Sequence, residues 1–213
     1  MKRMRILFCK ISSMKYYKGA CDLDVPMYGG KFVEENGYGH EEFNFRPIEM
    51  EGEVEPECIG FVEPKSNRGT RNTLHIENIE GCETMRKEPC VDDVLVIWCA
   101  KRDYGDVTVV GWYKHATVWR DLQGWTVMFD DGTEENRYYN VRAKAADCTL
   151  IPSGERNRAI WSIPSAKRTG VYGFGQSMVW YPTEPEAENY LTRLLKNIES
   201  YRDENWLNKW PEE

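Results

Sequence analysis

Two kinds of side chain stand out in this sequence as candidate general acids, general bases or metal ligands. They are three histidines, His40, His75 and His115, and two pairs of adjacent acids, Asp92-Asp93 and Asp130-Asp131. The histidines lack the spacing of a helical zinc motif, and the chain has no nucleophile elbow, P-loop or dinucleotide-binding glycine motif. The sequence therefore predicts no catalytic residue, no metal and no cofactor. A nuclease or hydrolase that depends on Asp92 or Asp93 is the alternative that it leaves open.

Charge is distributed unevenly along the chain. The net charge is −7, and an acidic surface repels phosphate groups, which argues against strong non-specific binding to nucleic acid. Residues 183–213 carry a net charge of −4, whereas residues 148–182 carry +3. The loop that contains Lys65, Arg68 and Arg71 is also basic. These two basic segments predict either solvated loops or one face that binds a polyanion.

The seven cysteines indicate neither a disulfide framework nor a zinc site, because their number is odd and no CxxC pair occurs. A chain of this length buries a sizeable core without disulfides, so a reducing cytoplasm is favoured. The apolar run near the N-terminus is too short for a signal peptide, and no stretch is long enough to cross a bilayer. The sequence therefore predicts a cytoplasmic protein with no membrane partner.

Hydrophobic patterns predict many strands followed by one helix. Strands are predicted at residues 5–11, 31–33, 58–62, 74–79, 91–100, 107–113, 116–119, 125–129 and 138–143. Near the C-terminus, apolar side chains recur at helical spacing and Thr183 forms a capping box with Glu186, which predicts an amphipathic helix at about residues 183–203. This order predicts a single α+β domain over residues 1–213, with a bent sheet or small β-barrel.

The run from residue 91 to residue 121 resembles the central segment of the EVE domain, a member of the PUA superfamily that also includes the YTH and SRA-like readers. Residues 93–98 match the first strand of that segment, and residues 109–113, with their Val-Val-Gly, match the second. Phe8-Cys9-Lys10-Ile11 is similar to the start of the first strand of such domains. The sequence departs from the pattern at Asp92, where the family has glycine. The resemblance implies a PUA-like, EVE-type fold with flanking helices.

The resemblance also implies a function. Residues 150–152 and 173–177 resemble domains of modification-dependent restriction proteins, in which such a domain stands beside a nuclease. The expected activity is recognition of a modified base, for example a methylated base, in DNA rather than RNA, in restriction or defence and with a possible nuclease partner. The base would be extruded from the strand into an aromatic pocket. A protein-interaction or small-ligand module on the same fold is the alternative.

Three groups of residues would form this implied site. The ring walls would be Tyr16, Tyr17, Trp98, Trp112, Tyr113 and Trp180, since aromatic rings stack on bases. Loop polar groups would satisfy the base edge, from Ser12, Ser13, Asn36, Asn44, Gln176 and Ser177. The phosphates would be held by Lys15, Arg68, Arg71, Arg156, Arg158 and Lys167. Core packing is the alternative role for Trp98 and Trp112, and turn formation for many of the polar residues.

Overall fold

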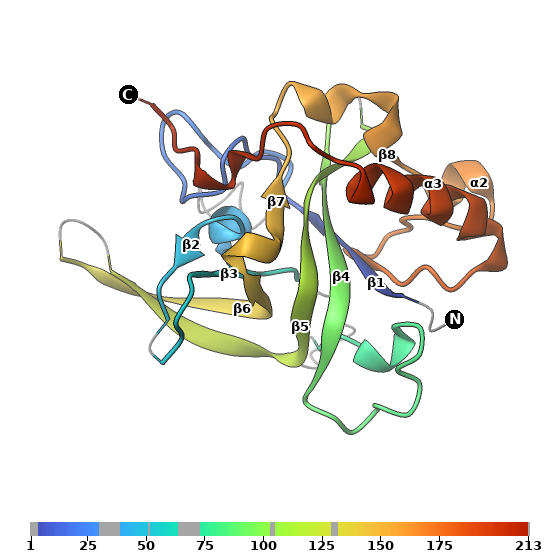
Figure 1. Ribbon diagram of the computed structural model, residues 1–213, viewed down its shortest axis with the longest axis horizontal. Coiled ribbons are helices and arrows are strands. Elements are labelled where there is room, and N and C mark those ends of the chain that lie inside the picture. Colours follow the sequence, from blue (N-terminus) through green and yellow to red (C-terminus); the bar gives the residue numbers. More distant parts are fainter. Residues whose placement is uncertain are drawn as a thin grey trace.

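A mixed sheet of nine strands forms the centre of the computed structural model, which describes residues 4–29, 39–50, 52–63, 73–102, 105–128 and 132–212 (Figure 1). The strands run in the order β2-β3-β6-β5-β4-β1-β9, and β7 and β8 pair with β5 outside this path. Their bounds are β1 Arg5–Ile11, β2 Pro47–Ile48, β3 Glu57–Gly60, β4 Cys90–Lys101, β5 Val107–Met128, β6 Glu134–Lys144, β7 Cys148–Leu150, β8 Ser162–Ile163 and β9 Val179–Trp180.

The helical elements in the described residues are short and few. The α-helices are α2 Ala166–Thr169 and α3 Glu188–Glu199. Single 3-10 turns occur at His40–Phe43, Ile76–Asn78, Ala145–Asp147, Glu155–Asn157, Ala159–Trp161, Pro185–Ala187 and Trp206–Asn208. No helix in the described part of the chain has the length and apolarity needed to span a membrane.

Strands β1 and β4 lie side by side and run parallel, with Ile11 opposite Ala100. Residues 6–9 of β1 and residues 94–100 of β4 are continuous apolar runs that are buried. Such runs are typical of strands that are covered on both faces of a sheet. Because the two strands are parallel, their carboxyl ends lie at the same edge of the sheet. The loops that follow Ile11 and Lys101 therefore begin next to each other.

Strand β5 is long and pairs with different neighbours along its length. Its first half is antiparallel to β4, and residues 117–128 pair with β6. Its first half also pairs with β7, where Gly111 lies opposite Leu150. A Cβ atom at Gly111 would collide with the carbonyl oxygen of Thr149 and the ring of Phe45. Glycine is required here because β7 and Phe45 approach the backbone of β5 so closely.

The sheet separates two hydrophobic clusters. One contains Trp98 and Tyr113, which pack against Phe45 and other buried residues from the loops on that side. The other contains Trp112 and Trp161. Helix α3 covers this second cluster and contributes Leu194 and Ile198 to it. Trp98 of β4 and Trp112 of β5 thus lie on opposite faces of the sheet, and both are buried.

The structure confirms an α+β, sheet-dominated protein and corrects several details. Within the described residues the sheet stays open, because β2 and β9 end the strand path, so the alternative of a small barrel is wrong. The predicted strand at 116–119 and residues 125–128 of the predicted strand at 125–129 are parts of β5, and residue 129 lies outside the described residues. Residues 76–78 of the predicted 74–79 strand form a 3-10 turn, and the predicted strand at 31–33 lies outside the described residues.

The helix prediction is confirmed in type but not in its bounds. Helix α3 begins at Glu188 rather than near Thr183, because Pro185 starts a separate 3-10 turn ahead of it. The Thr183 backbone N–H bonds to the carbonyl of Tyr181, and no side chain caps α3, so the predicted capping box is wrong. Helix α3 ends at Glu199, four residues before the expected end.

Candidate functional site

After β1 the chain turns sharply around the carboxylate of Asp24. The backbone N–H groups of Lys15, Tyr16 and Tyr17 donate to this carboxylate over 2.6, 2.8 and 3.1 Å. Tyr17 adopts a left-handed backbone with φ of 55°, and successive N–H groups in such a turn converge on one anion. Asp24 is buried and fills this nest itself. It therefore fixes the loop after β1 against the segment that contains Asp24.

The segment around Asp24 presents a row of exposed apolar side chains. Leu23, Val25, Met27 and Tyr28 are exposed by 49, 54, 50 and 44%. The segment is held in place because Ser13 and Met27 exchange two backbone hydrogen bonds, of 2.7 and 3.0 Å. Contiguous exposed apolar residues in a folded protein commonly mark a binding surface. We call residues 23–28 the apolar wall.

The end of β4 and the start of β5 face this wall across two adjacent hollows. The first hollow has a volume of about 350 Å³ and is lined by Ser13, Lys15, Lys101, Arg102 and Arg156, among others. The second has a volume of about 470 Å³ and is lined by Lys10, Tyr28, Lys101, Arg168 and Gln176, among others. Lys101 is common to both hollows. We call the two hollows together the β1–β4 groove, because it lies at the carboxyl ends of those strands.

The β1–β4 groove is basic although the protein is acidic. Among the described residues, its lining has two carboxylates, Asp22 and Asp24, and six cationic side chains: Lys10, Lys15, Lys101, Arg102, Arg156 and Arg168. Asp106 pairs with both Arg102 and Arg168, at 3.7 and 2.9 Å, so one acid is shared by two cations. Clustering positive charge in a recess concentrates its field there, which attracts anions.

Arg156 shapes the groove rather than binding a phosphate. Its guanidinium donates to the carbonyl oxygens of Ile151, Met14 and Lys15 over 2.8, 2.6 and 2.7 Å. The side chain is buried, so a phosphate-binding role for it is wrong. Arg156 instead joins the loop after β7 to the loop after β1.

Four of the predicted ring walls lie inside the protein. Tyr17, Trp98, Trp112 and Tyr113 are at most 1% exposed and belong to the two core clusters. A ligand cannot reach these rings, so the prediction that they line an open pocket is wrong. Trp180 is also buried and stacks on Phe8 at 4.5 Å between ring centroids. The alternation of side chains along a strand could not predict this burial. It shows which residues share a face of the sheet, but not whether that face is covered.

The remaining ring candidate, Tyr16, is half-buried and stacks on Trp206 at 5.3 Å. It is not among the residues that line the described hollows.

The predicted polar and basic residues divide between the groove and other places. Ser13, Lys15 and Gln176 line the groove. Asn44 is buried and exchanges two hydrogen bonds with the backbone of Phe61, and Ser12 is buried, so neither reads a base edge.

The other three described candidates are not in the groove lining. Ser177 accepts a hydrogen bond from the backbone of Val179. Arg158 pairs with Glu155 and Asp203. Lys167 is exposed on α2. Asn36, Arg68 and Arg71 lie outside the described residues.

Sequence reasoning missed the groove residues Lys10, Tyr28, Lys101, Arg102 and Arg168. Lys101 and Arg102 carried a usable signal, since they end a buried strand directly and so belong to a sheet edge. Tyr28 carried none, because its place in the groove depends on the turn around Asp24.

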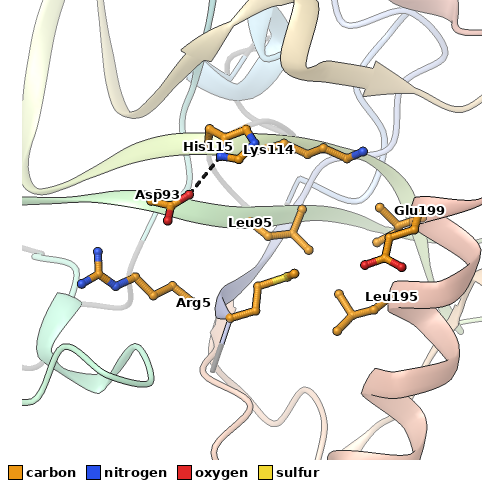
Figure 2. Close-up of a pocket in the computed structure, with 9 residues that line it drawn as sticks. Arg5, Asp93, Leu95, Lys114, His115, Leu195 and Glu199 are labelled. Carbon is orange, nitrogen blue, oxygen red and sulfur yellow. Dashed lines mark hydrogen bonds and ion pairs between the residues drawn. The ribbon is translucent and has the colours of Figure 1, made fainter. Parts of the chain in front are cut away.

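A separate cavity outside the groove, of about 340 Å³, lies between the β4–β5 ladder and α3. Figure 2 shows Asp93 and His115 joined at one end of it and Leu195 and Glu199 of α3 at the other. The Asp93 carboxylate binds His115 Nδ1 at 2.9 Å, and both residues adopt left-handed backbones, with φ of 59 and 51°. Two neighbouring bulges in the ladder place them there.

The rim of this separate cavity has balanced charges. The two cations Arg5 and Lys114 are matched by the two acids Asp93 and Glu199. Asp92, the other candidate acid, accepts a hydrogen bond from the Thr117 hydroxyl. In the described part of the chain, no three His, Cys, Asp or Glu side chains are grouped to hold a metal ion. The β1–β4 groove is therefore the stronger candidate for an anionic ligand.

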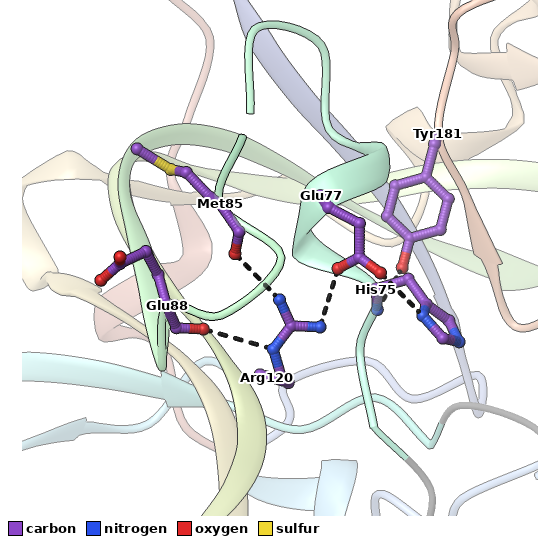
Figure 3. A network of polar contacts seen from close by, with 6 residues as sticks. All are labelled: His75, Glu77, Met85, Glu88, Arg120 and Tyr181. Atoms are coloured by element: carbon purple, nitrogen blue, oxygen red, sulfur yellow. Dashed lines mark hydrogen bonds and ion pairs between the residues drawn. The ribbon is translucent and has the colours of Figure 1, made fainter. Parts of the chain in front are cut away.

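Arg120 organises a polar network beside β5 (Figure 3). It donates to the Glu77 carboxylate at 2.7 Å and to the carbonyl oxygens of Met85 and Glu88 at 3.0 and 3.2 Å. His75 contributes Nδ1 to Glu77 and its backbone N–H to the Tyr181 hydroxyl, both at 3.2 Å. The network draws residues 75–88 onto the sheet, which explains why a turn replaces the predicted strand.

The network makes stability depend on pH through Glu77. Burial favours the neutral acid, but hydrogen bonds from Arg120, its own backbone and His75 outweigh it and lower the pKa of Glu77 to about 2. A lowered pKa stabilises the fold above the ordinary value near 4.5, and this contribution disappears as pH falls toward 2. Glu77→Gln should therefore lower the free energy of unfolding by about 1.5–3 kcal/mol at pH 7, as expected for hydrogen bonds to charged groups.

Urea unfolding of both proteins at pH 7 and pH 3 measures this effect, and the difference between them should shrink at pH 3. Glu88→Gln is the control, because only the backbone of Glu88 contacts Arg120. An equal loss from Glu77→Gln at both pH values would contradict the assignment.

Comparisons with known proteins identify no relative. No protein-family model matches the chain, and neither the curated proteins nor the solved structures include a significant match. The resemblance to the EVE domain rests on the sequence motifs alone and stays a prediction.

Proposed function

We propose that the protein binds nucleic acid, with phosphate groups held in the β1–β4 groove. The observation that carries the proposal is the concentration of five cationic side chains, besides the buried Arg156, around two adjoining hollows in a protein whose net charge is −7. Lysine and arginine in a recess supply the sequence-independent part of nucleic-acid affinity. The hydroxyl of Ser13 and the amide of Gln176 offer hydrogen bonds in the same groove.

The proposal does not include the aromatic pocket that the sequence resemblance implied, because most of the rings expected to line that pocket are core residues. Recognition of a modified base would have to use other groups in the groove. An oligonucleotide with a methylated base, compared with its plain counterpart, tests whether such discrimination exists.

Fluorescence anisotropy with a labelled oligonucleotide tests the proposal. We expect binding at about 50 mM salt that weakens steadily as salt rises. The reason is that the protein displaces salt cations from the phosphates when it binds, and a higher salt concentration opposes this release. With about two to four phosphates neutralised, log K should fall with log salt at a slope of about −1.5 to −3 for a single strand. Absence of binding at low salt would contradict the proposal and favour a protein-interaction or small-ligand module.

A further inference from the structure

We infer that the nucleic acid held in the β1–β4 groove is single-stranded, with its bases against the apolar wall and its phosphates on the basic side. This inference rests on the nucleic-acid binding proposed above. It adds the strand state and the surface that contacts the bases. The inference rests on the observation that four exposed apolar side chains line the same hollows as the basic residues of the groove.

The two sides of the groove suit the two halves of an unpaired nucleotide. Leu23, Val25 and Met27 face the first hollow, which Lys15 and Arg102 also line. In a duplex the base faces stack on one another, so they cannot cover these apolar side chains. In a single strand the base faces are available to do so. A single strand therefore buries the apolar wall, whereas a duplex would leave it exposed beside phosphates.

Tyr28 is positioned as a stacking platform in the second hollow. Its ring is 44% exposed, and the Lys101 ammonium lies 5.4 Å from the ring centroid. Tyr28 adopts a left-handed backbone with φ of 59°, a conformation that is costly for a bulky residue. Single-strand binders combine aromatic rings that stack on bases with a positively charged groove that follows the phosphates, and this hollow contains both kinds of group.

The size of the hollows points the same way. Volumes of about 350 and 470 Å³ fall in the range of small-ligand pockets, about 300–1,000 Å³. Each can take a group of the size of a nucleotide. Because Lys101 borders both hollows, it is placed to contact the phosphate between two neighbouring nucleotides.

The test compares a labelled oligothymidylate of about 12 nucleotides, within the usual site sizes of about 4–16, with a duplex of the same length. We expect the single strand to bind about tenfold more tightly. Tyr28→Ala should weaken single-strand binding by about 5- to 150-fold, which is the measured range for losing one base–aromatic stack. Tyr28→Phe should retain binding because it retains the ring. Tyr138→Ala, which removes a ring of 45% exposure on β6, should have no effect.

The outcomes separate this inference from the proposed function. Equal or tighter binding of the duplex, or a Tyr28→Ala variant that is folded and binds like wild type, would overturn the single-strand inference and leave nucleic-acid binding intact. Failure of both probes to bind at low salt would overturn both. Polyglutamate that displaces the oligonucleotide at equal charge concentration would show that the groove takes acidic peptides instead, which also overturns the inference.

Discussion

Replacing Lys101 with glutamate is expected to weaken oligonucleotide binding by about 10- to 100-fold at low salt. Lys101 lines both hollows, so the change replaces attraction by repulsion where the two meet. One charge pair near a protein surface contributes about 1–4 kcal/mol at 4 Å, and 1.4 kcal/mol is tenfold in affinity. Fluorescence anisotropy at about 50 mM salt measures the effect.

A matched variant controls for the change in overall charge. Lys196→Glu makes the same charge reversal on α3, where Lys196 is exposed and lines neither hollow. It should lower affinity by less than about threefold, because an exposed charge that does not line the groove acts on the ligand only through solvent that salt screens. Equal losses in the two variants would mean that binding responds to net charge and not to the groove.

Replacing Trp112 with alanine should destabilise the fold by about 3–5 kcal/mol, the usual cost of truncating a buried tryptophan. Its ring is 1% exposed and packs 5.7 Å from Trp161 and 5.3 Å from Tyr201, between β5 and the region that α3 covers. Folded domains are stable by only about 5–15 kcal/mol, so this loss is a large fraction of the total. Urea unfolding measures it.

Two further variants separate a core role from a ligand-binding role for Trp112. Trp210→Ala removes an indole that is 49% exposed and should cost about 1 kcal/mol or less. Trp112→Phe keeps most of the buried ring and should leave a folded protein with wild-type affinity for oligonucleotides. Weakened oligonucleotide binding by folded Trp112→Phe would place that ring in the site and contradict its assignment to the core.

The central strands could be predicted from sequence because their signals are local. The run at residues 91–100 is β-rich and apolar, and the structure has β4 at Cys90–Lys101. The stripe on the C-terminal helix likewise predicted α3. Local signals could not predict that Trp98 and Trp112 are both buried. Alternation places them on opposite faces, but only the loops and α3 determine that both faces are covered.

The groove depends on contacts between distant parts of the chain, which no local pattern reports. Asp24 is one acid among many in the sequence, yet it binds three consecutive backbone N–H groups and so positions the apolar wall. Tyr28 and Lys101 meet only because β1 and β4 end at the same edge. Arg156 was predicted to bind phosphate because it lies in a basic segment, but its burial assigns it to the scaffold.

The most direct test of the central claim, that this groove holds the phosphates, is the slope of log affinity against log salt for wild type and Lys101→Ala. Removing one cation that contacts a phosphate reduces the magnitude of the slope by about one for duplex DNA and slightly less for a single strand. The groove assignment predicts this reduction for Lys101→Ala and an unchanged slope for Lys196→Ala. A slope that Lys101→Ala leaves at the wild-type value would contradict it.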